Sequence, residues 1–147
     1  MDKYIWIAIT FIAGVILPLQ AGINTKLGKA VSSPAMASLL SFMVGLLAML
    51  VYIIVTQQSY SLKGLKDAPP HAWLGGILGA FYVTVIILAF PKIGPGLTFG
   101  LVVAGQLLLS IIMEHYQIMG AHHHPVSIGR VLGMLMIIGG VLVIKKM

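Results

Sequence analysis

Five apolar segments, each long enough to cross a lipid bilayer, dominate this 147-residue sequence. The hydrocarbon core of a bilayer is about 30 Å thick, and a helix needs roughly 20 apolar residues to cross it. Hydrophobic residues make up 59% of the chain and charged residues only 8%. A soluble domain of this length could not bury so much apolar surface, because small domains keep a large share of their surface in water. The sequence therefore predicts an integral membrane protein.

The five segments are expected to be helices. A bilayer allows only helices or closed barrels, because no water is present to satisfy backbone hydrogen bonds, and the segments lack the two-residue alternation of a barrel strand. Ser or Pro stands where several of them begin, as is typical of helix starts. The expected spans are residues 4–24, 34–56, 72–90, 97–118 and 127–144. We expect one all-α membrane domain, residues 1–147, with five transmembrane helices.

The positive charges are almost evenly divided between the two sides of the membrane. With five spans, one side carries four cations: Lys3, Lys63, Lys66 and Arg130. The other side carries five: Lys26, Lys29, Lys92, Lys145 and Lys146. Positive charge fixes orientation only when one side has a clear excess, so the sequence permits insertion both ways. A neighbouring subunit or one dominant loop that sets a single orientation is the alternative.

A chain of only five helices encloses little space, so a solute pathway is expected to require a second copy or a related chain. Many transporters consist of two repeats of opposite topology, with the binding site at the membrane midplane between them. We therefore expect one half of an inverted-repeat, ten-helix transporter, assembled as an antiparallel dimer in membrane lipid.

Glu114 is the single acidic residue within the spans, and Gln106 and Ser110 precede it at four-residue intervals. These three side chains share one helix face, which should line a cavity or an interface because polar groups facing lipid are costly. We interpret Glu114 as a proton- or cation-binding group and the other two as substrate contacts. In the alternative interpretation, Glu114 reaches the headgroup region beside His115.

The first span has a similar pair, Gln20 and Asn24. They either line the same cavity or form hydrogen bonds between helices. Small residues, which allow close helix approach, are expected to mediate packing or dimerisation. They are Ser38, Ser41 and Gly45 in the second span, Gly75 and Gly79 in the third, and Gly129, Gly133 and Gly140 in the fifth.

Several classes of function are disfavoured. The chain has no Cys, which excludes disulfides and thiol catalysis, and no Ser lies in a nucleophile motif, so we expect neither an enzyme nor a cofactor. His122, His123 and His124 are adjacent in a loop without acidic neighbours, so no metal site is expected. The net charge of +6 comes from residues that flank spans and does not indicate nucleic-acid binding.

Several short motifs occur in the order typical of one family. They are Leu19-Gln20-Ala21-Gly22-Ile23-Asn24-Thr25-Lys26-Leu27-Gly28, Ser41-Phe42-Met43-Val44-Gly45, Trp73-Leu74-Gly75-Gly76, Pro91-Lys92-Ile93-Gly94 and Ala104-Gly105-Gln106. The chain resembles the YdcZ-like five-helix proteins of the drug/metabolite transporter superfamily, distant relatives of the small multidrug resistance transporters. Gln20, Asn24, Gln106 and His115 match the family pattern. That pattern ends the fourth helix in Asp-His-Phe-Gly, where this chain has Glu114-His115-Tyr116-Gln117.

The resemblance implies a multi-pass protein of the bacterial inner membrane with oppositely oriented halves. We expect a subunit of a secondary transporter for a small, cationic or amphipathic metabolite or drug, paired with itself or a sister chain. Gln20, Asn24, Gln106 and Ser110 would line the pathway, with Glu114 as the coupling group. The alternatives are a membrane scaffold that transports nothing and a passive pore.

Overall fold

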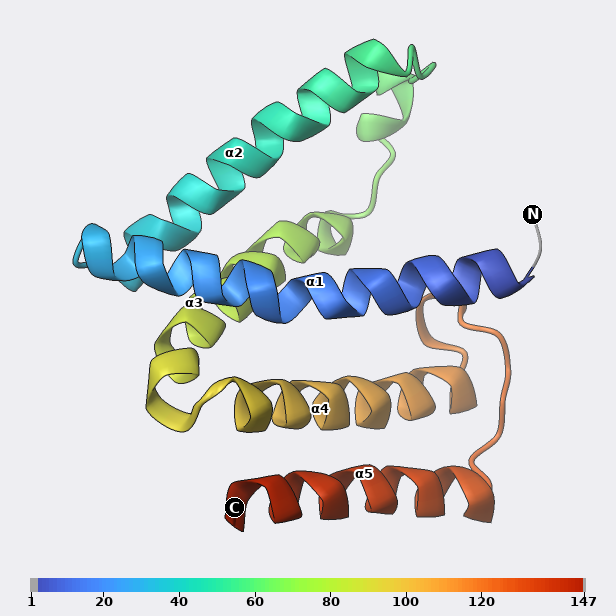
Figure 1. The fold of residues 1–147 in the computed structure, drawn as a ribbon. Coiled ribbons are helices and arrows are strands. Elements are labelled where there is room, and N and C mark those ends of the chain that lie inside the picture. The colour runs from blue at the N-terminus through green and yellow to red at the C-terminus, as the bar shows by residue number, and fades with distance from the viewer. Residues whose placement is uncertain (1–2, 147) are drawn as a thin grey trace. The chain divides into compact units, whose positions relative to one another are not determined.

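The computed structural model describes residues 3–146, and it shows five long helices with no strand in that range (Figure 1). The long helices are α1 (Lys3–Ala30), α2 (Pro34–Val55), α3 (Leu74–Ile93), α4 (Pro95–His115) and α5 (Ile128–Lys146). The short 3-10 helices are η1 (Leu62–Leu65), η2 (Pro70–Trp73) and η3 (Ile118–Gly120). All five are long and apolar enough to span a membrane, which confirms the predicted all-α fold with five membrane-length helices.

All five helices differ from the predicted spans by one or more residues at an end, and three of these differences have a local cause. Helix α1 runs beyond Asn24 to Ala30, because no proline follows Asn24 before Pro34 and the helix continues through Gly28. Helix α4 begins at Pro95 after Gly94, whose φ of 78° is readily adopted only by glycine. It ends at His115 because Gln117 takes a left-handed conformation, which breaks the helical hydrogen-bond pattern.

The chain divides into two compact units, of which the first covers residues 3–92 of the described part. Helices α1 and α2 meet at a short turn and separate toward their other ends (Figure 1). Ser33 caps α2 by accepting a hydrogen bond from the Met36 amide at 3.2 Å. Near this turn a Cβ on Gly28 would lie 3.2 Å from Ile87 Cγ2, so α1 and α3 pack closely there.

Polar contacts reinforce the first unit between α2 and α3. The Ser38 and Thr84 hydroxyl oxygens lie 2.9 Å apart, and the Thr84 hydroxyl also lies 2.8 Å from the Ala80 carbonyl oxygen. Ser38 is buried, so this hydrogen bond links the two helices inside the unit. Hydrogen bonds of this kind are a common source of helix association in membranes.

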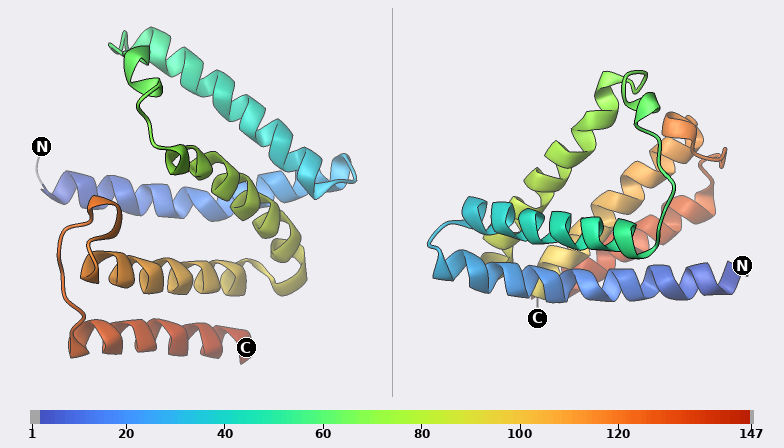
Figure 2. Two further views of the ribbon diagram at one scale, coloured as in Figure 1. Left: turned by 180° about the vertical axis from the view of Figure 1, so that it is seen from behind. Right: turned by 90° about the horizontal axis from the view of Figure 1, so that it is seen from above.

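The second unit begins at Ile93 and contains α4 and α5, which run side by side in opposite directions (Figure 2). Glycines in α4 allow the close approach. A Cβ on Gly96 would lie 3.5 Å from Ile144 Cγ2, and one on Gly100 would lie only 2.8 Å from Val141 Cγ2. Of the glycines in these two helices, Gly100 therefore lies closest to the neighbouring helix.

Candidate functional site

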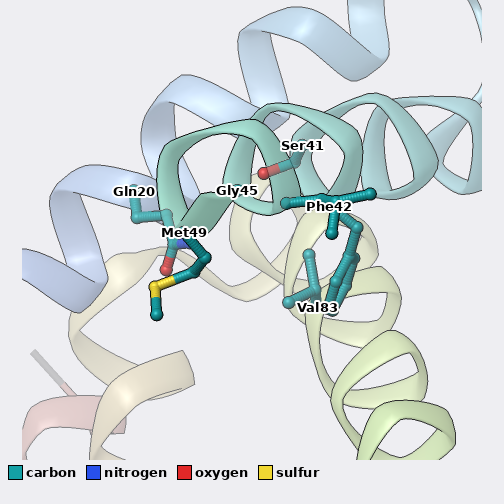
Figure 3. A pocket seen from close by; sticks show the side chains of 7 residues that line it. Gln20, Ser41, Phe42, Gly45, Met49 and Val83 are labelled. Atoms are coloured by element: carbon teal, nitrogen blue, oxygen red, sulfur yellow. The ribbon is translucent and has the colours of Figure 1, made fainter. Parts of the chain in front are cut away.

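A groove of about 440 Å³ opens on the first unit, and α1, α2 and α3 all contribute to its wall (Figure 3). The residues that line it are Gln20, Ser41, Phe42, Gly45, Leu46, Met49 and Val83. Most of the wall is apolar, while the Gln20 amide and the Ser41 hydroxyl can each donate and accept hydrogen bonds. This size and composition are typical of sites for small organic molecules, in which a few polar groups fix the orientation of an apolar ligand.

The local sequence explains why the groove is open. Residues 41, 45 and 49 lie on one face of α2, because steps of four residues advance only about 40° around a helix. Gly45 has no side chain, and no heavy atom within 4 Å would meet a Cβ placed there. Phe42 of α2 packs against Gly79 of α3, where a Cβ would lie 3.5 Å from Phe42 Cζ. A gap in the side chains of α2 thus lies beside an aromatic wall.

The two polar residues predicted on α1 lie in different environments. Gln20 is exposed and lines the groove, whereas Asn24 is 5% exposed and lies in the core of the unit. Ser41 and Gly45, predicted as packing residues, are part of the groove wall. Their four-residue spacing next to Ser38 is the sequence signal that would have identified a lining face.

In the second unit, Glu114 forms an ion pair with Arg130 of α5. The side chains are about one-third exposed, at 32% for Glu114 and 31% for Arg130. The Arg130 guanidinium also donates a 3.0 Å hydrogen bond to the His124 carbonyl oxygen, and the His124 amide donates a 3.2 Å bond to the Glu114 carbonyl oxygen. From the sequence Arg130 was expected only to flank a span, and no pattern in the sequence indicates that it pairs with Glu114.

His115 belongs to the same arrangement. Its Nδ1 accepts a 3.3 Å hydrogen bond from the Val126 amide. Glu114, His115 and Arg130 together hold the segment 121–127 against the end of α4. Gln106 and Ser110, earlier on α4, are exposed on the surface of the chain and take no part in these contacts.

The predicted packing glycines mostly face open space within the chain. A Cβ placed on Gly75, Gly129, Gly133 or Gly140 would have no heavy atom of a neighbouring helix within 4 Å among the described residues. Their role in contacts with a second chain stays a prediction. Gly79 is the exception, because a Cβ there would lie 3.5 Å from Phe42 Cζ of α2. The other glycines that lie against neighbouring helices were not predicted to do so, namely Gly22, Gly28, Gly96 and Gly100.

Sequence comparison establishes the family. Residues 5–143 match the family described as "Putative inner membrane exporter, YdcZ". The chain belongs to the YdcZ family. The inner membrane protein YdcZ of Escherichia coli (strain K12) is 24% identical over 151 residues, which cover 99% of each sequence. No solved structure matches the chain. These findings and the five membrane-length helices identify a multi-pass inner-membrane protein, as the sequence predicted.

One departure from the YdcZ-like pattern now has a structural counterpart. The position where that pattern has Gly is occupied by Gln117, which adopts φ 55° and ψ 33° directly after the α4 C-cap. A left-handed residue at this place is a common way to end a helix, and glycine adopts it without steric cost. The chain therefore keeps the helix ending with a less suitable residue.

Proposed function

We propose that this chain is one subunit of a small exporter, and that its groove on α1–α3 carries a neutral, amphipathic solute. The proposal rests mainly on the groove itself. Its lining combines apolar side chains with one amide and one hydroxyl and includes no charged residue. A charged solute would lose hydration there without gaining an ionic partner, whereas an amphipathic neutral solute would keep its hydrogen bonds. The family description as an exporter supports the direction of transport.

A second chain of opposite orientation is part of the proposal. Gln106 and Ser110 are exposed on α4, and an amide that faced lipid there would be unfavourable. A partner would cover them and bring them to the pathway between the subunits. The nearly even distribution of Lys and Arg supports antiparallel pairing, either with itself or with a sister chain. Alternating access would then follow from rocking of one half against the other.

The coupling role of Glu114 is a separate part of the hypothesis. Because Arg130 already occupies this carboxylate, a cationic solute would have to displace the guanidinium. A proton faces the same ion pair, because the guanidinium favours the charged carboxylate, so Glu114 could take up a proton only when the pair opens. Protonation in that open state would keep Arg130 released and loosen the segment 121–127. This view keeps solute binding in the first unit and coupling in the second.

An efflux assay in bacterial cells tests the proposal. Cells are loaded with the neutral dye Nile red in the presence of an uncoupler and re-energised with glucose, and the fluorescence decay is recorded. We expect faster clearance with the protein than with an empty vector. Gln20→Leu should slow it about fivefold, because a hydrogen bond is worth about 1 kcal/mol. Gln58→Leu, the same replacement in an exposed loop, should have no effect.

Two results would count against the proposal. Clearance equal to the vector control would favour the scaffold alternative, and clearance by Gln20→Leu at the wild-type rate would remove the groove from the pathway. Export of ethidium in place of Nile red would show that the solute class is cationic.

A further inference from the structure

A second, smaller pocket lies where α1 ends, α2 begins and α3 ends, and it shares no residue with the groove. Its volume is about 160 Å³. The residues that line it are Thr25, Gly28, Lys29, Pro34, Ile87, Leu88, Pro91 and Lys92. The pocket therefore combines two lysines from different helices with an apolar wall from α3.

Close packing at Gly28 creates this arrangement. A Cβ at this position would lie 3.2 Å from Ile87 Cγ2, 3.6 Å from Ala37 Cβ and 3.8 Å from Pro34 Cα. The three helices can converge here only because Gly28 has no side chain. As a result Lys29 and Lys92, which lie in the last turns of α1 and α3, border one pocket.

The positive charge at this pocket has no acidic counterpart in the first unit. Asp67 is the one acidic residue among residues 3–92, and it precedes α3 at the opposite end from Lys92. A helix of the length of α3 spans about 30 Å, which is far beyond ion-pair distance. Lys26, one turn before Lys29, adds a further positive charge near the pocket.

Thr25 places a buried, unsatisfied hydroxyl in the pocket wall. It is 7% exposed and forms part of the pocket wall, and its hydroxyl has no hydrogen-bond partner among the described residues. A buried hydroxyl left without a partner is costly, so most such groups in native proteins are satisfied. An acceptor oxygen bound in the pocket would satisfy it.

We propose that this pocket binds the phosphate headgroup of an anionic phospholipid. Lys29 and Lys92 provide the positive charge, Thr25 donates a hydrogen bond, and Ile87, Leu88 and Pro91 contact the apolar part of the lipid. Basic pockets between membrane helices commonly bind anionic headgroups at this level. The apolar wall favours a lipid over free phosphate, which has no use for it.

Native mass spectrometry of the full chain in detergent measures the binding, with phosphatidylglycerol and phosphatidylcholine of identical acyl chains as probes. We expect saturable binding of phosphatidylglycerol only. Lys29→Gln with Lys92→Gln should weaken it about 25-fold, because each lysine near an anionic lipid contributes about fivefold. The control, Lys63→Gln with Lys66→Gln, removes the same charge from an exposed loop and should bind like wild type.

Thr25→Val separates a ligand contact from a merely structural role. It should weaken phosphatidylglycerol binding and, because it removes an unpartnered buried hydroxyl, raise the unfolding midpoint in the absence of that lipid. Lys29→Arg with Lys92→Arg should retain binding, which controls for misfolding of the Gln variant. Equal binding of phosphatidylcholine, or equal affinity of the two double Gln variants, would overturn the proposal. Saturable binding of inorganic phosphate with the same lysine dependence would assign the site to free phosphate and overturn the lipid assignment.

Discussion

The packing of α4 against α5 predicts that the effect of a substitution at Gly100 depends on the residue at position 141. In Gly100→Ala the new Cβ would lie 2.8 Å from Val141 Cγ2 and 3.4 Å from Val141 Cγ1. Carbon atoms pack best at about 3.5–4.0 Å, so one helix must move by about 1 Å or Val141 must change rotamer. The β-branched valine has little rotamer freedom in a helix, so movement of the helix is the expected response.

The magnitude follows from two opposing effects. Overpacking a well-packed contact costs about 1–3 kcal/mol, while Ala in place of Gly favours a helix by about 1 kcal/mol. Gly100→Ala alone should therefore lower the free energy of unfolding by roughly 0–2 kcal/mol. With Val141→Ala the two Cγ atoms are absent, and the next nearest atom, the residue 141 Cβ at 3.6 Å, is in ordinary contact. In that background Gly100→Ala should stabilise the protein.

Equilibrium unfolding of the four proteins of this cycle, by titration with sodium dodecyl sulfate in mixed micelles, measures the coupling. We expect a coupling energy of about 1–3 kcal/mol between positions 100 and 141. Gly105→Ala is the matched control, because no atom lies within 4 Å of a Cβ there and only helix propensity changes. If Gly100→Ala has the same effect with Val and with Ala at position 141, the described packing of the two helices is wrong.

Three further predictions concern the loops. Gln117→Gly should raise the free energy of unfolding by about 1 kcal/mol, since the left-handed conformation strains residues other than glycine; the same detergent titration measures it. Arg130→Gln or Glu114→Gln should speed hydrogen exchange in the segment 121–127, and the swapped pair Glu114→Arg with Arg130→Glu should restore protection; no change in either single variant would argue against the ion pair. Ser59→Cys, labelled in cells by an impermeant maleimide, should react from outside in about half of the molecules if orientation is dual; labelling from one side alone would exclude the antiparallel homodimer.

The five-helix fold could be predicted from the sequence because the apolar segments are long and most of the charged residues lie outside them. The helix ends were harder, since they depend on single residues such as Gly94 and Gln117. Gln117 ends α4 by adopting a conformation that its side chain disfavours, so its identity gives no signal of the role. The family resemblance marked the position as unusual without indicating its conformation.

The candidate site was only partly predictable. Four-residue spacing identified polar faces, but a face can line a groove, as at Ser41, or lie in the core beside another helix, as at Asn24. Helical spacing alone does not determine which of the two occurs, because that depends on how the helices pack against one another. The partnership of Glu114 with Arg130 was missed for a similar reason, because the two residues lie on different helices and each has a separate explanation within its own segment.

Thiol accessibility within the groove tests the central claim, that the groove carries solute through the membrane. The natural chain has no Cys, so a single Cys at Ser41 or at Met43 can be compared in native membranes. Two residues along α2 rotate the side chain by about 200°, so Met43, 52% exposed and outside the groove, is a control at nearly the same depth. A water-soluble methanethiosulfonate should modify Ser41→Cys and leave Met43→Cys unreacted, because only a solute pathway brings water to this depth. Equal lack of reaction at both positions would show that lipid or protein fills the groove, and would contradict the proposed pathway.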